Sequence, residues 1–172
     1  MLHNIFHLNC SFFYSLCFLF TGTRATSIFR KILCIMINFI KYNYASSSVE
    51  AYLSDGSNRS FSFSSISSFL NEMCLHFGSS LSGRIDSFKY HIGLKKKIPV
   101  FVNQYHFFIP IKTDFWINYE AIHEVQYLDK KNRCTISFHD HTSIDCTNPT
   151  FIEHILRHIF LFKTKISKIA SV

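Results

Sequence analysis

Apolar residues recur at helical spacing between residues 66 and 77, which makes this the clearest periodic segment of the chain. Their spacing places them on one face of an α-helix. Ser64 or Ser65 can cap the first turn, and Gly78 can end the helix in a left-handed conformation. The apolar positions of this helix are Ile66, Phe69, Leu70, Met73, Cys74 and Phe77.

Strand patterns dominate the second half of the chain. Apolar runs at Ile98–Val102 and Tyr105–Ile111 predict a hairpin. Pro99 cannot donate to a central ladder, so it confines the first strand to a sheet edge or to its opening residues. Trp116–Leu128 is expected to be a strand with a break near Glu120. Two further strands are expected at Arg133–His139 and Thr142–Cys146.

Two other signals complete the fold prediction. Asp55-Gly56 lies between two short apolar runs and indicates a hairpin. Asn148 followed by Pro149 indicates the start of a last helix, which carries an apolar face from Phe151 to Phe162. We therefore predict an α+β domain, in which an antiparallel sheet of hairpins, from about Ile98 to Cys146, is flanked by two or three helices.

The segment Gly78–Arg84 follows the first helix and combines two glycines, three serines and an arginine. One interpretation is a helix end followed by a turn, since turns favour glycine and serine. The other is an anion contact made by the hydroxyls, backbone N–H groups and Arg84. The segment is neither a Walker loop, because Arg84-Ile85 follows Gly83, nor a dinucleotide fingerprint, because it follows a helix.

The block from Cys74 to Arg84 resembles the C-x-x-F-G-S-S-x-x-G-R signature of the ComK family, the competence transcription factors of Gram-positive bacteria. Further matches occur in the order that the family shows, and the resemblance spans about residues 60 to 160. They are Ile98-Pro99-Val100, Phe107-Phe108-Ile109-Pro110, Trp116-Ile117-Asn118 and the runs TISFHD and SIDC.

The resemblance implies a transcription activator that binds double-stranded DNA and favours A/T-rich sites, largely through the minor groove. Self-association on DNA is a further expectation for the partners of this chain. Longer family members carry a basic, aromatic carboxy-terminal tail used in proteolytic control through a Clp adaptor. This chain shows no match to that tail, so adaptor-driven degradation is not carried over.

The net charge of +7 suits a nucleic-acid or membrane-surface partner. Most cations after residue 80 fall in three clusters at predicted loops or strand ends, where they can reach a phosphate backbone. Arg84 is the candidate for insertion into a narrow, A/T-rich minor groove, on the assumption that it lies on a flexible loop. The candidate DNA-binding residues are Arg84, Ser79, Ser80, Lys89, Lys95, Lys96, Lys97, Lys130, Lys131 and Arg133.

Residues 1–35 form a separate apolar segment without acidic residues, and residues 36–172 form the ComK-like domain. Phe12–Phe20 is similar to a signal-peptide core, but it is shorter than the roughly 20 apolar residues of a spanning helix. Besides a signal peptide and a membrane-spanning segment, a third hypothesis is that translation starts at Met36, because the resemblance to the family shows no counterpart for the first 35 residues. If the segment anchors the chain, the alternative function is a small membrane-associated protein whose basic face binds anionic lipid. The third candidate function for the whole chain is a protein-interaction module that binds no nucleic acid.

The remaining chemistry points away from an enzyme or a cofactor. The six cysteines have no C-x-x-C spacing, which is typical of reduced thiols in a cytoplasmic protein. His154 and His158, with His139 and His141, could be drawn as zinc ligands, but the spacing of known modules is missing. We expect surface or capping histidines, no catalytic group, no small-molecule substrate and no metal.

Overall fold

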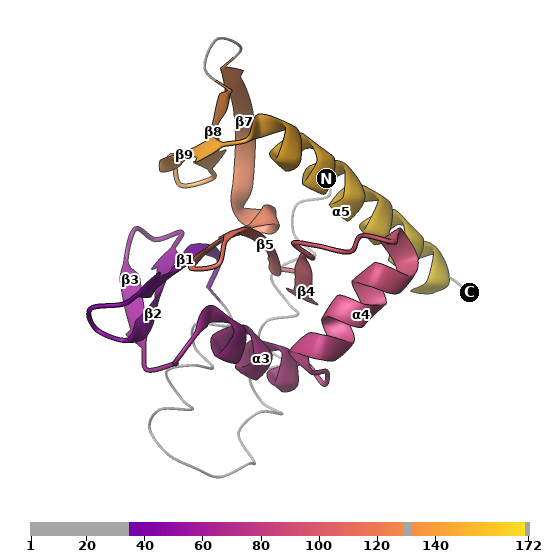
Figure 1. Ribbon diagram of the computed structural model, residues 1–172, viewed down its shortest axis with the longest axis horizontal. Coiled ribbons are helices and arrows are strands. Elements are labelled where there is room, and N and C mark those ends of the chain that lie inside the picture. Colours follow the sequence, from indigo (N-terminus) through magenta and orange to yellow (C-terminus); the bar gives the residue numbers. More distant parts are fainter. Residues whose placement is uncertain (1–34, 129–131, 171–172) are drawn as a thin grey trace, which may run out of the picture. The chain divides into compact units, whose positions relative to one another are not determined.

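The computed structural model describes residues 35–128 and 132–170 (Figure 1). The predictions for the N-terminal segment lie outside these residues, except at Ile35. The helices are α3 (Ile66–His76), α4 (Leu81–Ile92) and α5 (Pro149–Ala170), and η2 (Tyr119–Ala121) is a 3-10 turn. The strands are β1 (Ile37–Asn43), β2 (Ser48–Leu53), β3 (Asn58–Phe61), β4 (Val100–Asn103), β5 (His106–Lys112), β6 (Phe115–Asn118), β7 (Ile122–Leu128), β8 (Arg133–Phe138) and β9 (Ser143–Thr147).

The strands form two antiparallel sheets, so the α+β prediction is confirmed but the single sheet from Ile98 to Cys146 is wrong. One sheet has the order β3-β2-β1-β6-β5-β4 and the other β7-β8-β9. The predicted break near Glu120 is confirmed as η2, which ends β6 and directs the chain into the second sheet. The prediction missed β1, which pairs with both β2 and β6. Pro99 directly precedes β4, which is an edge strand as expected.

The buried core brings both sheets together with α4 and α5. Phe107 and Ile109 of β5 contribute from the larger sheet, and Ile136 and Phe138 of β8 from the smaller one. The buried face of α5 and Phe88 of α4 belong to the same cluster. Burying each such side chain contributes about 1.5 to 3 kcal/mol, so α5 stabilises the arrangement of both sheets. The residues from α5 are Ile152, Ile155, Ile159 and Phe162.

A second buried group is polar and sits where β5, β6 and the start of the domain meet. His106 is fully buried, and its ring nitrogens lie 3.1 Å from Asn103 Oδ1 and 3.2 Å from the carbonyl oxygen of Ile35. Burial lowers the pKa of His106 to about 4, outweighing the hydrogen bond to Ile35, which favours the charged form. The ring is therefore neutral in the folded protein at neutral pH.

We expect this buried ring to make the domain less stable in mild acid. Between the unfolded value of 6.5 and about 4, the unfolded chain binds a proton that the folded protein does not. The free energy of unfolding should therefore fall by about 3 kcal/mol as the pH is lowered through that window. Urea denaturation at several pH values measures the fall, and His106→Gln should remove that part of it. An identical pH dependence in the variant would contradict the assignment.

Candidate nucleic-acid interface

The glycine- and serine-rich block is a tight connection between α3 and α4. The first helix ends with Phe77 as its cap, and Gly78 follows with a left-handed φ of 74°. The hydroxyl of Ser80 then caps α4 by accepting a hydrogen bond of 3.1 Å from the N–H of Gly83. The predicted flexible loop from Gly78 to Arg84 is therefore wrong beyond Ser80, because the cap starts a new helix at Leu81.

Gly83 lies close to the serines that precede it. A Cβ atom at this position would lie 3.1 Å from Ser79 Oγ and 3.4 Å from Ser80 Oγ. The absence of a side chain therefore leaves room for the capping hydroxyl. The serines shape the helix junction, and Ser80 already uses its oxygen within the protein.

Arg84 lies in the first turn of α4 and is half-buried. Its Nη2 donates a hydrogen bond of 3.0 Å to the carbonyl oxygen of Phe77. Its guanidinium carbon lies 5.8 Å from the centre of the Phe101 ring, on the edge strand β4. Its Nε is buried without a hydrogen-bond partner. The side chain thus connects α3, α4 and β4, and it does not project from a flexible loop.

Lys89 is exposed on α4, near the end of the helix. Its ammonium group lies 3.2 Å from a carboxylate oxygen of Asp86, one turn earlier. Exposed pairs of this kind contribute at most about 1 kcal/mol, so the lysine can exchange its partner for a phosphate at little cost.

Lys95, Lys96 and Lys97 lie between α4 and β4, and all three are exposed. Lys97 Nζ donates a hydrogen bond of 3.1 Å to the carbonyl oxygen of Ile111, and it lies 4.5 Å from the centre of the Phe151 ring. This contact brings the lysines to the end of β5. The exposed Lys112 directly follows Ile111 there.

Lys112 therefore joins the three predicted lysines, and we call these four residues the lysine edge. Since β4 and β5 are antiparallel neighbours, the segment before β4 and the end of β5 must meet at one end of the pair. Across residues 35–128 and 132–170, no lysine of this edge forms an ion pair. Sequence reasoning missed Lys112 because it stands alone in the chain, although the predicted hairpin implied its position.

The third predicted cluster is only partly described. Arg133 is half-buried at the first position of β8, whereas Lys130 and Lys131 lie outside the described residues. The β7–β8 hairpin and the α3–α4 junction lie at opposite ends of the domain in Figure 1. The predicted clusters thus do not converge on one small site, and only a long, extended ligand could contact all of them.

Lys165 is a further cation, which is not among the predicted DNA-binding residues. It lies in the second half of α5, and its Nζ donates a hydrogen bond of 2.6 Å to the carbonyl oxygen of His91 in the last turn of α4. A cation beside such a carbonyl group is stabilising, because the C-terminus of a helix carries partial negative charge. The contact joins α5 to the helix that carries Lys89.

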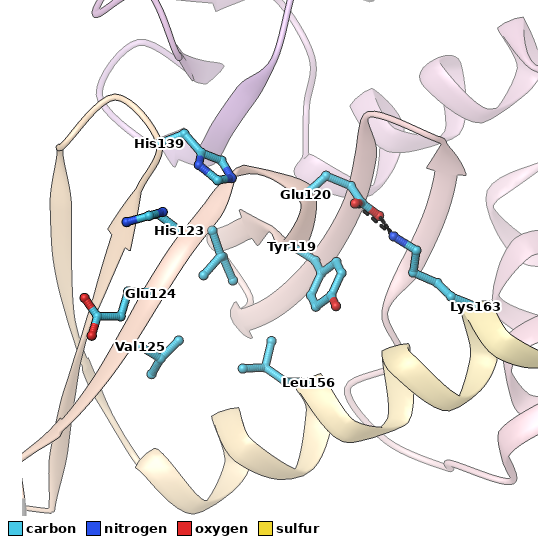
Figure 2. A pocket seen from close by; sticks show the side chains of 9 residues that line it. Tyr119, Glu120, His123, Glu124, Val125, His139, Leu156 and Lys163 are labelled. Carbon is cyan, nitrogen blue, oxygen red and sulfur yellow. Dashed lines mark hydrogen bonds and ion pairs between the residues drawn. The ribbon is translucent and has the colours of Figure 1, made fainter. Parts of the chain in front are cut away.

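An open cavity of about 490 Å³ lies between the start of β7 and α5 (Figure 2). Glu120 and Lys163 form an ion pair of 2.8 Å at its border, and Lys163 also lies over the ring of Tyr119. His123 and His139 line the other side, with ring centres 5.3 Å apart. Among the described residues that line the cavity, none is a serine, threonine or cysteine that a neighbouring histidine could activate as a nucleophile.

Metal-ligating groups and membrane-spanning helices would indicate other classes of function. Within the described segments, no three histidine, cysteine or acidic residues are grouped so that they could hold a metal ion. Of the helices that the structure describes, none is both long enough and apolar enough to cross a membrane. The apolar N-terminal segment, on which the membrane alternative depends, lies outside the described residues.

Comparison with known proteins identifies a family. A family model with the description ComK protein matches residues 27–169. The match begins before Met36, so the expectation that the first 35 residues lack a family counterpart is wrong for residues 27–35. No curated protein and no solved structure matches the chain.

Proposed function

This chain belongs to the ComK family, and from that premise we propose that it is a transcription activator that binds double-stranded DNA. It favours A/T-rich sites and reads them largely through the minor groove. The observation that carries the proposal is the lysine edge, where four exposed lysines from two segments lie at one end of the β4–β5 pair and form no ion pair with any described residue. Such a surface complements the regularly spaced charges of a phosphate backbone.

In this proposal the lysines supply affinity without sequence information. Lys95, Lys96 and Lys112 contact phosphates directly, because nothing in the described protein holds their ammonium groups. Lys97 is held by Ile111 and supports the edge. Lys89 is a secondary phosphate contact, and so is Arg133 at the start of β8. From their place in the sequence we assign the same role to Lys130 and Lys131.

The salt dependence of binding tests this proposal. Three phosphate contacts release three counterions, so the logarithm of affinity should fall against the logarithm of salt concentration with a slope of about −2.7 or steeper. Fluorescence anisotropy of a labelled duplex titrated with the full chain measures that slope. Binding that does not respond to salt, or no binding by folded protein, would contradict the proposal. The stoichiometry of the same titration reports self-association on DNA.

Arg84 requires a test that separates reading of DNA from support of the fold. Because its guanidinium is held by Phe77 and Phe101, we expect Arg84 to position the α3–α4 junction and not to enter the groove. Arg84→Ala should then lower the midpoint of thermal unfolding. It should reduce affinity for A/T-rich and G/C-rich duplexes by the same factor. A lower ratio of the two affinities with unchanged stability would instead assign minor-groove insertion to Arg84.

A further inference from the structure

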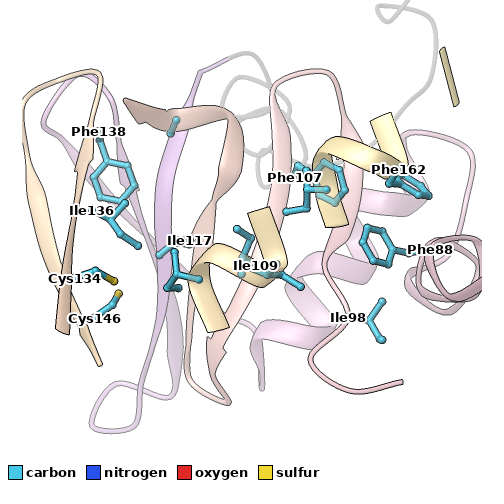
Figure 3. Close-up of a cluster of buried hydrophobic side chains, with 14 residues drawn as sticks. Phe88, Ile98, Phe107, Ile109, Ile117, Cys134, Ile136, Phe138, Cys146 and Phe162 are labelled. Carbon is cyan, nitrogen blue, oxygen red and sulfur yellow. The ribbon is translucent and has the colours of Figure 1, made fainter. Parts of the chain in front are cut away.

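Cys134 and Cys146 lie directly opposite each other on the antiparallel strands β8 and β9. Both are reduced, and their exposed fractions are 0% and 3%. Residues at opposite positions point to the same face of a sheet, and both side chains belong to the buried core. Figure 3 shows the two side chains next to each other, with adjacent sulfur atoms.

This register satisfies the geometric needs of a disulfide bond. Directly opposite residues in antiparallel strands have Cα atoms about 4.5 to 5.5 Å apart. Disulfides accept Cα separations of about 4.4 to 6.8 Å, so the bond requires no shift of either strand. Cys74 is a natural contrast, because it is equally buried on α3 but lies outside this core cluster.

We propose that Cys134 and Cys146 form a site for reversible oxidation to a disulfide, with a hydroperoxide as the oxidant. One thiolate attacks the outer oxygen, the O–O bond breaks, and the leaving oxygen takes up a proton to become an alcohol or water. The resulting sulfenic acid is attacked by the second thiol, which forms the S–S bond and releases water. In total, two thiols and one hydroperoxide give one disulfide, one alcohol or water, and one water.

Access to the site depends on the edge strand. β9 is the outer strand of its sheet, and Cys146 is its penultimate residue. Strand ends at sheet edges open locally at low free-energy cost, so a small peroxide can reach the thiols without global unfolding. Burial raises the pKa of Cys146 to about 11 and that of Cys134 in the same direction, which keeps the pair inert while the strand is closed.

Peptide mapping of the full chain tests the proposal without any substitution. Both cysteines fall in the single tryptic peptide from Cys134 to Arg157, which contains no other cysteine. The folded, reduced protein is treated with hydrogen peroxide, denatured, alkylated and digested. We expect this peptide to lose two hydrogen atoms and to take up no alkyl group, and dithiothreitol should reverse both changes. Cys74 should remain fully alkylated.

Two results would overturn the proposal. One is a doubly alkylated peptide after oxidation, and the other is a disulfide that joins either cysteine to a different peptide.

A second measurement concerns the stability of the folded state. The bond closes a loop of 13 residues, so oxidation should raise the midpoint of thermal unfolding by about 10 °C. Cys146→Ala should abolish this rise, and a rise that persists in the variant would also contradict the assignment.

Discussion

Replacing Asn118 by alanine is expected to lower the free energy of unfolding by about 3 to 5 kcal/mol. The side chain is fully buried at the end of β6. Its oxygen accepts from the N–H groups of Phe107 and Glu120, at 2.9 and 3.2 Å. Its amide nitrogen donates to the carbonyl oxygens of Ile37 and Tyr105, at 2.7 and 2.8 Å. Alanine would leave these backbone groups without their partner inside the protein.

Urea denaturation measures this loss as a lower midpoint with an unchanged slope. Asn58→Ala is the matched control, because Asn58 is exposed on the edge strand β3, and it should change stability by less than about 0.5 kcal/mol. A loss below about 1 kcal/mol for Asn118→Ala would show that water or a local rearrangement replaces the amide.

The second large effect is expected on DNA affinity. Replacing Lys95, Lys96 and Lys112 together by alanine should weaken binding about 10- to 100-fold at moderate salt, and equally for every sequence. Each phosphate contact releases one counterion on binding, so a variant that lacks three contacts releases three fewer counterions. The slope of affinity against salt should therefore become flatter by about 2.7. Anisotropy titrations at several salt concentrations measure both quantities.

A control must separate the lysine edge from a general loss of positive charge. Lys41 and Arg59 are exposed on β1 and β3, and β3 is the opposite edge of the same sheet from β4. Lys41→Ala combined with Arg59→Ala should leave the salt slope almost unchanged. If this control flattens the slope as much per charge as the first variant, the lysine edge has no special role.

The periodic elements of this fold could be predicted from the sequence because their signals are local. The face of α3, the hairpin of β4 and β5, and the start of α5 at Pro149 each depend on spacing, turn residues or caps. The apolar pattern that indicates α4 is weaker than that of the other helices. Ile85, Phe88 and Ile92 have helical spacing and pack in the core, but the glycines and serines before them suggested a loop.

β1 could not be predicted because its pattern depends on a distant partner. Asn38 is buried and interrupts the alternation of apolar residues, and the register shifts beside it. Its amide donates a hydrogen bond of 2.7 Å to Asp140, in the turn between β8 and β9. A contact between residues so far apart in sequence stabilises a buried polar group that no local pattern indicates.

The candidate DNA-binding site likewise combines features that are visible in the sequence with features that depend on the fold. The runs of lysine were visible in the sequence, but their meeting with Lys112 depends on strand pairing. Arg84 was selected because glycine and serine suggested flexibility, whereas the structure holds its side chain against Phe77 and Phe101. Residue type indicates which groups can contact a phosphate, but only the fold shows which of them are already engaged.

The central claim, that the chain recognises A/T-rich DNA through the minor groove, is tested most directly by comparing its affinity for three duplexes of equal length. The duplexes are rich in A·T, G·C or inosine·C pairs, and the affinities are measured by anisotropy titrations with the full chain. Inosine lacks the exocyclic amino group of guanine, so its minor groove presents the acceptors of an A·T pair while its major groove remains like that of G·C. The proposed minor-groove recognition predicts that the chain binds the inosine·C duplex nearly as tightly as the A·T duplex, and both more tightly than the G·C duplex. Equal affinity for all three duplexes, or an inosine·C duplex that binds like G·C, would contradict it.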